Sequence, residues 1–218
     1  MILDKQTSVK TAKYLLQINA IKLSPENPFS WASGWKSPIY CDNRISLSYP
    51  KVRNFLGNQL AFQAKTIYKN KDFIIAGVAT GAIGIGMLVA QKLDLPFIYV
   101  RPEQKKHGKK NQIEGYMADN SNVVVIEDLI STGKSSLNAV EALRNEGANV
   151  LGMLGLFTYG FKVADENFKD SKIHLNTLSD YNSLIKEALN QKLINSNSLS
   201  KLTSWRKSPE KWDFNKSI

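Results

Sequence analysis

The sequence predicts an α/β fold whose central sheet is mostly parallel and flanked by helices. Between residues 73 and 157, short apolar segments alternate with longer segments of helical spacing, which is typical of βαβ units. Residues 123–126 are Val-Val-Val-Ile, and an uncharged β-branched run suits a strand covered on both faces. Neither a repeat nor a Pro/Gly/Ser-rich linker divides the 218 residues. We therefore expect one large domain.

The single domain, residues 1–218, is expected to have distinct parts. These are an N-terminal hood of helix and short strands over about residues 1–45, an α/β core over about residues 70–160, and a C-terminal extension over about residues 195–218. The sequence indicates no role for the extension, although Trp205 and Trp212 indicate that it packs against the rest of the chain.

The hood should begin with a helix over residues 7–20, because Val9, Ala12 and Leu16 recur at helical spacing. Residues 23–44 then interleave prolines and glycine with aromatic side chains, which favours short strands and turns. Pro50 suits the first turn of a helix, and apolar spacing extends that helix to the mid-sixties.

The core is expected to alternate strands with helices. Strands are predicted at residues 73–78, 96–100, 123–126 and 150–157. A glycine-rich turn and helix occupy residues 81–92, and another helix follows residue 136 and closes at Gly147. The pattern leaves the order of strands in the sheet open.

The most informative segment is residues 123–136, where the apolar strand is followed by Glu127 and Asp128 and then by Ser-Thr-Gly-Lys-Ser-Ser. Amide groups at a helix N-terminus lack internal partners and carry partial positive charge, so this turn suits a phosphate. The acids sit at the carboxyl end of a strand, where open α/β sheets bind ligands. A pair of carboxylates beside an anion-binding loop suits a ligand with hydroxyls at one end and a phosphate at the other, such as ribose 5-phosphate.

Two other interpretations of this segment are possible. Gly133, Lys134 and Ser135 match the end of the nucleotide-triphosphate loop, but Asp128 stands where that pattern needs its first glycine. Ordinary capping by Ser131 and Thr132 is the structural alternative. Capping does not call for adjacent acids, so the ribose-phosphate interpretation is favoured.

Composition indicates the class of protein and the charge of the partners that it attracts. Hydrophobic content of 43% and charged content of 22% are typical of a globular protein, and the net charge of +10 indicates attraction to anions. Cys41 is the only cysteine, no apolar run reaches membrane-spanning length, and the N-terminus lacks the pattern of a signal peptide. We therefore expect a cytoplasmic protein without a membrane partner. No Cys/His metal cluster is present, so any metal should arrive with the substrate.

Residues 123–136 resemble the ribose-phosphate signature of type I phosphoribosyltransferases. The resemblance implies that Glu127 and Asp128 bind the ribose hydroxyls and that residues 131–135 wrap the 5′-phosphate. It also implies that residues 80–82, in a second glycine-rich turn, approach the pyrophosphate of 5-phosphoribosyl 1-diphosphate. Taken alone, that turn equally suits close helix–sheet packing.

Two further segments resemble orotate phosphoribosyltransferases. Arg101, Lys105 and His107 have the spacing of their catalytic loop, and residues 33–44 resemble their base-binding segment; the resemblance extends over about residues 15–189. A solvated loop is the alternative for residues 101–110, but five cations there favour a mobile lid over a phosphorylated ligand.

The resemblance implies a homodimeric enzyme that transfers the 5-phosphoribosyl group from 5-phosphoribosyl 1-diphosphate to orotate with Mg2+, giving orotidine 5′-monophosphate and pyrophosphate in pyrimidine (UMP) biosynthesis. Arg101, Lys105 and His107 would be catalytic, Lys106 would reach the other subunit, and Ser131, Lys36 and Tyr40 would contact orotate. The implied phosphoribosyl-diphosphate residues are Arg101, Lys105, Lys106, His107, Glu127, Asp128, Leu129, Ile130, Ser131, Thr132, Gly133, Lys134 and Ser135.

Three positions depart from better-known members, which carry Lys at the positions of Ala32 and Gly81 and Arg at that of Tyr159. The segments Ile-Tyr-Cys-Asp-Asn-Arg and Phe-Thr-Tyr-Gly match another branch of the family. Two alternatives stay open: a regulator on the same fold that binds nucleic acid through its positive charge, and a phosphoribosyltransferase for another base. A regulator would not need the cations of the loop in register.

Overall fold

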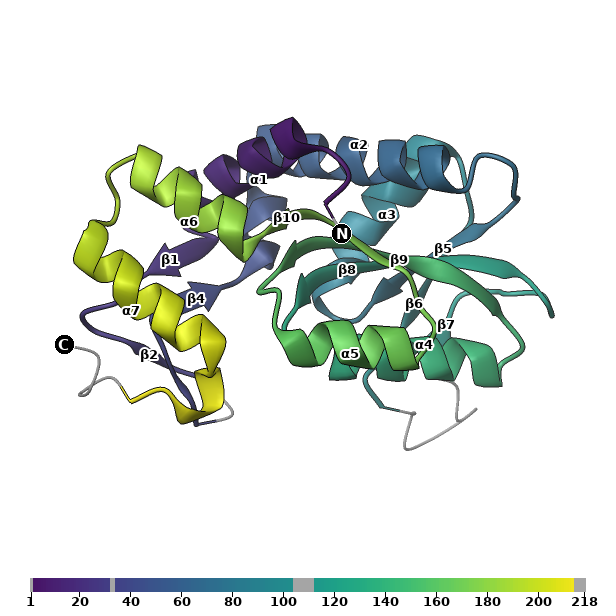
Figure 1. The fold of residues 1–218 in the computed structure, drawn as a ribbon. Helices are drawn as coiled ribbons and strands as arrows, with labels where there is room; N and C mark the ends of the chain where they lie inside the picture. The colour runs from purple at the N-terminus through teal and green to yellow at the C-terminus, as the bar shows by residue number, and fades with distance from the viewer. Residues whose placement is uncertain (1, 32–33, 104–111, 214–218) are drawn as a thin grey trace.

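The computed structural model describes residues 2–31, 34–103 and 112–213 (Figure 1). The helices are α1 (Lys5–Gln17), α2 (Pro50–Ile67), α3 (Gly81–Leu93), α4 (Lys134–Asn145), α5 (Lys162–Asp170), α6 (Tyr181–Asn190) and α7 (Ser196–Lys207), with 3-10 turns η1 (Asn43–Ser48) and η2 (Pro209–Lys211). The strands are β1 (Ile21–Leu23), β2 (Phe29–Ser30), β3 (Lys36–Ser37), β4 (Ile39–Cys41), β5 (Ile74–Val78), β6 (Phe97–Val100), β7 (Ile113–Glu114), β8 (Asn122–Ile130), β9 (Asn149–Thr158) and β10 (Leu175–Asp180).

Within the described residues, six strands form the central sheet in the order β10-β9-β8-β5-β6-β7. Every neighbouring pair is parallel except β6 and β7. Helices α2 and α3 cover one face, and α4 and α5 cover the other (Figure 1). The α/β prediction with a mostly parallel, helix-flanked sheet is therefore confirmed.

Strand β8 is buried on both faces, as its sequence predicts. Val124 and Ile126 pack into the core under α2 and α3, while Val123 and Val125 pack into the core under α4. This alternation follows from the two-residue period of a strand. The strand does not end at residue 126, however, because pairing with β9 continues to Ile130. Both acids therefore lie on a strand rather than after it.

The N-terminal helix begins earlier and ends earlier than its apolar spacing predicts. The Asp4 carboxylate accepts hydrogen bonds from the backbone N–H of Gln6 (3.2 Å) and of Thr7 (2.7 Å), which caps the helix at Lys5. At the other end, Asn19 has a positive φ of 55°, which stops the helix before residue 20. Helix α1 packs against α6 and β10.

The predicted short strands of the hood are present as two antiparallel pairs, β1 with β4 and β2 with β3. In Figure 1 these strands lie beside α6 and α7. The extension thus forms a helix against the hood, and its Trp205 is fully buried.

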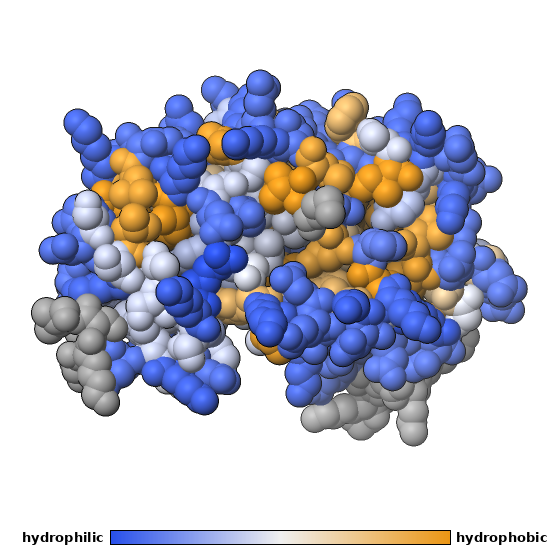
Figure 2. Space-filling view, in the orientation of Figure 1, coloured by the Kyte–Doolittle hydropathy of each residue, from blue (hydrophilic) through white to orange (hydrophobic). Residues whose placement is uncertain are grey.

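Surface polarity agrees with the packing of the helices. The surface over α5 itself is hydrophilic (Figure 2), since Ala164 and Phe168 of that helix are buried. In the part of the chain that the structure describes, no helix is both long and apolar enough to cross a membrane.

Candidate active site

Glu127 and Asp128 lie on the wall of a cavity of about 450 Å³ at the carboxyl ends of β5 and β8. The Glu127 side chain is 4% exposed, and its carboxylate accepts hydrogen bonds from Ser136 Oγ (2.7 Å) and from the backbone N–H of Asp128 (3.0 Å). These bonds hold the carboxylate in place. The more exposed Asp128 is left to present its carboxylate to the cavity.

Burial governs the protonation of this pair. It raises the pKa of Glu127 well above the ordinary value, and the neighbouring charge of Asp128 raises it further, while the Ser136 hydrogen bond acts in the opposite direction. Burial also raises the pKa of Asp128, whereas the Glu127 hydrogen bond and the positive charge of Arg44 lower it. Adjacent buried acids with raised pKa values are typical of functional sites.

The loop after β8 forms the anion-binding side of the cavity, which Ser131, Thr132, Gly133 and Ser135 line. Gly133 has a φ of 79°, and a Cβ there would meet the Phe168 ring, so the turn requires glycine. Asn167 Nδ2 donates to the Thr132 carbonyl (2.9 Å) and fixes the loop. Helix α4 begins directly after this loop with no side-chain cap, and the first amides of a helix lack intrahelical partners, so they are suited to an anion.

The turn between β5 and α3 forms the opposite wall, which residues 78–81 line. Its Ala79–Thr80 peptide bond is cis, and Ala79 N–H donates to the Val100 carbonyl (2.8 Å). A Cβ at Gly81 would meet the Asp128 carboxylate. The absence of a side chain at Gly81 therefore lets the turn and the acid pair approach each other.

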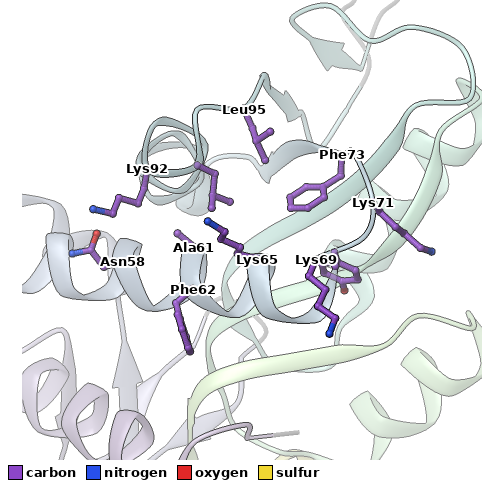
Figure 3. Close-up of a pocket in the computed structure, with 11 residues that line it drawn as sticks. Asn58, Ala61, Phe62, Lys65, Lys69, Lys71, Phe73, Lys92 and Leu95 are labelled. Atoms are coloured by element: carbon purple, nitrogen blue, oxygen red, sulfur yellow. The ribbon is translucent and has the colours of Figure 1, made fainter.

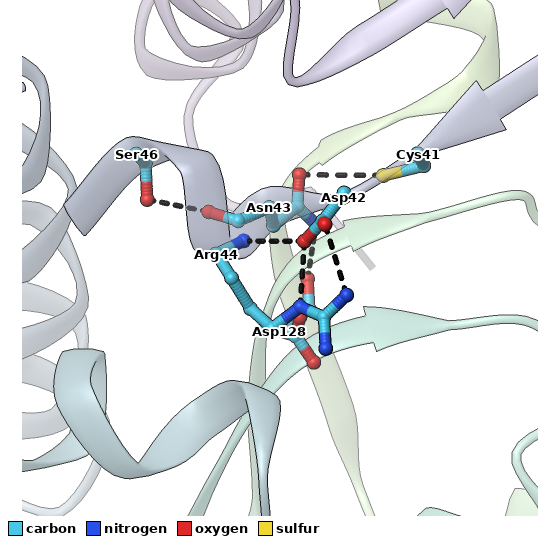
Figure 4. A network of polar contacts seen from close by, with 6 residues as sticks. All are labelled: Cys41, Asp42, Asn43, Arg44, Ser46 and Asp128. Atoms are coloured by element: carbon cyan, nitrogen blue, oxygen red, sulfur yellow. Dashed lines mark hydrogen bonds and ion pairs between the residues drawn. The ribbon is translucent and has the colours of Figure 1, made fainter. Parts of the chain in front are cut away.

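The end of the hood closes the cavity through Cys41, Asp42 and Arg44 (Figure 4). The buried Asn43 joins it to β8, because its Nδ2 donates to the Asp128 carbonyl (2.6 Å). Arg44 forms an ion pair with Asp42, and the hydrogen bonds from Arg44 lower the pKa of Asp42. Burial raises the pKa of the Cys41 thiol.

Sequence reasoning did not single out Asp42, Asn43 or Arg44 as site residues. They belong to the segment that resembles a base-binding element, and a cluster of polar residues directly after the aromatic Tyr40 was the available signal. Only the tertiary fold brings them to Asp128, which lies 85 residues further along the chain from Asn43.

The structure brings most of the residues predicted to bind phosphoribose to one cavity: Glu127, Asp128, Leu129, Ser131, Thr132, Gly133 and Ser135. Ile130 is buried in the core under α4, and Lys134 is an exposed residue at the start of α4; neither lines the cavity. Arg101 follows β6 and forms an ion pair with Glu114 (3.5 Å). Lys105, Lys106 and His107 lie outside the described residues.

The orotate residues proposed from the hood are placed apart from this cavity. Lys36 donates to Ser30 Oγ (2.8 Å) across the β2–β3 pair, and Tyr40 is 41% exposed beside Phe29. Ser131 does line the cavity. The roles of Lys36 and Tyr40 in binding orotate stay predictions.

A second cavity, of about 520 Å³, lies between the C-terminal ends of α2 and α3 (Figure 3). Phe73 and Leu95, which precede β5 and β6, line its apolar floor, and Lys65, Lys69, Lys71 and Lys92 surround it. It is therefore at the amino end of the sheet. Since open α/β sheets bind ligands at the carboxyl ends of their strands, the acid-lined cavity is the candidate active site.

The chain matches known proteins over most of its length. Residues 53–191 match the model of the family described as "Phosphoribosyl transferase domain". The chain is 53% identical to the orotate phosphoribosyltransferase of Porphyromonas gingivalis over 201 residues, which cover 92% of this chain and 95% of the relative.

The chain belongs to the orotate phosphoribosyltransferase family. Identity to the orotate phosphoribosyltransferase of Listeria monocytogenes is 48%, over 97% of this chain and 99% of that protein. The crystal structure of orotate phosphoribosyltransferase from Aeropyrum pernix has a TM-score of 0.71 at 27% identity and covers 84% of this chain and 99% of its own. The fold is thus that of the type I phosphoribosyltransferases, as the resemblance implied.

Proposed function

We propose that the protein transfers the 5-phosphoribosyl group from 5-phosphoribosyl 1-diphosphate to orotate, giving orotidine 5′-monophosphate and pyrophosphate in pyrimidine (UMP) biosynthesis. The observation that supports this proposal is that an acid pair and an anion-binding loop line the same cavity. The extent of identity to orotate phosphoribosyltransferases, at 53% over 92% of the chain, supports orotate as the base.

In the proposed reaction, the bond from ribose C1 to the diphosphate oxygen breaks and a bond from orotate N1 to C1 forms. Residues 131–135 would hold the 5′-phosphate, and Glu127 and Asp128 would hold the ribose hydroxyls. Positive charge develops on the sugar and negative charge on the leaving pyrophosphate, so preorganised charges contribute more than a strong base does. Orotate is already an anion near neutral pH through its carboxylate, which relaxes the need for a strong base; the proton on N1 is lost as the bond to C1 forms.

We assign the catalytic cations of this reaction to Arg101, Lys105 and His107, with Lys106 serving the other subunit of a homodimer. These assignments rest on the spacing of the residues in the sequence. Mg2+ is the proposed cofactor and would arrive with the diphosphate. The ion would be held through the substrate rather than by protein ligands, and the carboxylate and hydroxyl of Asp128 and Thr80 on the cavity wall suit the waters that such an ion retains. When bound, Mg2+ would neutralise charge on the pyrophosphate.

The proposed partners are the two small-molecule substrates and a second copy of the chain, in the cytoplasm, with neither nucleic acid nor a membrane. The positive charge of +10 suits anionic metabolites as well as nucleic acid. A nucleic-acid-binding regulator and an enzyme for another base are the competing functions.

An absorbance assay with orotate, 5-phosphoribosyl 1-diphosphate and Mg2+ tests the proposal, with uracil, hypoxanthine and adenine run in parallel. We expect consumption of orotate alone. Lys105→Ala should lower kcat by about 10²-fold, the scale for loss of one charge-stabilising donor. Lys169→Ala, which removes an exposed charge of α5, is the matched control. Absence of orotate consumption by the wild-type protein would falsify the proposed function.

A further inference from the structure

The candidate active site has an unusual balance of charge for a site that binds a polyanion. Among the described residues that line it, Asp42, Glu127 and Asp128 are acidic, and Arg44 is the only Lys or Arg. Acidic side chains repel a phosphorylated ligand at short range, because both are negatively charged. Among the described residues that line the cavity, Arg44 is the one that can place a fixed positive charge there, in addition to the cations assigned to the basic loop.

Arg44 is held in a geometry that leaves donors available. Its Nε and Nη2 donate to the two carboxylate oxygens of Asp42, at 2.7 Å and 2.9 Å. A guanidinium has five N–H donors in a rigid fork. Nη1 has no hydrogen-bond partner in the described part of the chain, and the side chain is 56% exposed. One edge of the fork is thus anchored, and the other can meet an oxyanion.

The position of Arg44 indicates which group of the ligand it meets. The loop over residues 131–135 already supplies amides and hydroxyls for the 5′-phosphate, and the acid pair faces the ribose. The remaining wall is the turn over residues 78–81, which carries no charged side chain. Nor is there room for one at Gly81, where even a Cβ would meet the Asp128 carboxylate. Arg44 lines the same cavity as this turn and is close enough to Asp128 for its charge to lower the pKa of that carboxyl.

We infer that Arg44 binds the diphosphate of 5-phosphoribosyl 1-diphosphate and is a catalytic residue supplied by the hood, with Asp42 as the residue that positions it. This inference rests on the proposed function. The diphosphate gains negative charge as its bond to C1 breaks, so a fixed guanidinium stabilises the transition state more than the ground state. The hood then contributes to departure of the leaving group as well as to recognition of the base.

The test compares Arg44→Gln and Arg44→Lys with Lys51→Gln, which removes an exposed positive charge at the start of α2 outside the cavity. Calorimetric titrations measure the binding of inorganic pyrophosphate with Mg2+ and, separately, of ribose 5-phosphate. Arg44→Gln should weaken pyrophosphate binding by about 10-fold or more, the scale for a charge-assisted hydrogen bond. Ribose 5-phosphate affinity should stay within about twofold. Arg44→Lys should recover part of the loss because it keeps the charge but not the fork.

Steady-state kinetics add a second measurement. Arg44→Gln should raise the KM for 5-phosphoribosyl 1-diphosphate and lower kcat, while Lys51→Gln should leave both unchanged. Unchanged pyrophosphate affinity, or an equal loss for ribose 5-phosphate, would overturn the inference, and so would absence of pyrophosphate binding by the wild-type protein. The titrations do not involve orotate. If the wild-type protein binds pyrophosphate as expected but does not consume orotate, the proposed base is wrong while the role of Arg44 stands.

Discussion

Two regions that both include residues of the hood differ in what they do for stability. The candidate active-site cavity holds Glu127 and Asp128, whose pKa values burial raises, so ionising either acid there costs stability. The other region, which we call the aromatic brace, consists of Trp31, Tyr159, Phe161, Tyr181 and Trp205. The comparison indicates that stability is supplied by the brace and that part of it is lost at the active site, as in many enzymes.

The aromatic brace is centred on Trp205 of α7, which is fully buried. Its ring lies 5.6 Å from Trp31 of the hood and 5.7 Å from Tyr159 after β9, measured between centroids. The next residue, Arg206, donates to the carbonyls of Tyr159 and Gly160, both at 3.0 Å. The C-terminal extension therefore ties the hood to the carboxyl edge of the sheet, a role that its sequence did not indicate.

Removal of the central ring should produce the largest effect. Trp205→Ala is expected to lower the free energy of unfolding by about 3–5 kcal/mol, because it deletes a fully buried aromatic side chain. Denaturant unfolding monitored by circular dichroism measures this. Trp205→Phe is the control and should lose less, since the indole N–H has no hydrogen-bond partner among the described residues. A loss below about 1 kcal/mol for Trp205→Ala would contradict the stabilising role of the brace.

Asp128→Asn should lower activity without lowering stability, the opposite of the stability loss expected for Trp205→Ala. The amide keeps the shape of the side chain but accepts hydrogen bonds without a charge, so we expect kcat/KM to fall by about 10- to 100-fold. The melting temperature should not fall, because a partly desolvated charge has been removed. Kinetics and scanning calorimetry on the same preparation separate the two effects. A marked loss of stability with near-normal turnover would contradict the comparison, because it would mean that Asp128 stabilises the fold rather than serving the reaction.

Glu127→Gln should have the smallest effect on stability, and that effect should depend on pH. Burial raises the pKa of Glu127 in the folded state, so its neutral form stabilises the fold below the ordinary glutamate range. That contribution is lost as pH rises through the raised pKa. Gln stays neutral, so the melting temperature of the variant relative to the wild-type protein should increase with pH by a few degrees.

A calorimetric series across the acid-to-neutral range measures this difference, with Glu141→Gln, an exposed position on α4, as the matched control. The control should show little dependence on pH. A difference for Glu127→Gln that does not change with pH would mean that its carboxyl titrates normally in the folded protein.

The sequence was most informative where structure is determined locally. The strand over residues 123–126 and the turn at Gly133 follow from side-chain type and spacing, and both are present. For the same reason, the predicted acids and most of the predicted anion loop lie together in one cavity, while their binding roles stay predictions. Helical spacing placed the first helix only approximately, because its true ends depend on capping by Asp4 and on the backbone of Asn19.

What could not be predicted depends on contacts between segments far apart in the chain. Strand β10 has the polar sequence Leu-Asn-Thr-Leu-Ser-Asp, which gives little strand signal until β9 pairs with it. The packing of Trp205 against Trp31 spans the hood and the extension. Similarly, Arg44 reaches the active site only because η1 packs against β8.

The hydrogen bond from Asn43 to the Asp128 carbonyl has a thermodynamic consequence for how the two substrates meet the protein. Because this bond joins the hood to β8, we expect a ligand that stabilises β8 at Asp128 to stabilise the hood as well, and the reverse. Such an interaction is a coupling free energy, and coupling between binding sites is reciprocal. The factor by which phosphoribosyl diphosphate changes the affinity for orotate must therefore equal the factor by which orotate changes the affinity for phosphoribosyl diphosphate, whichever binds first.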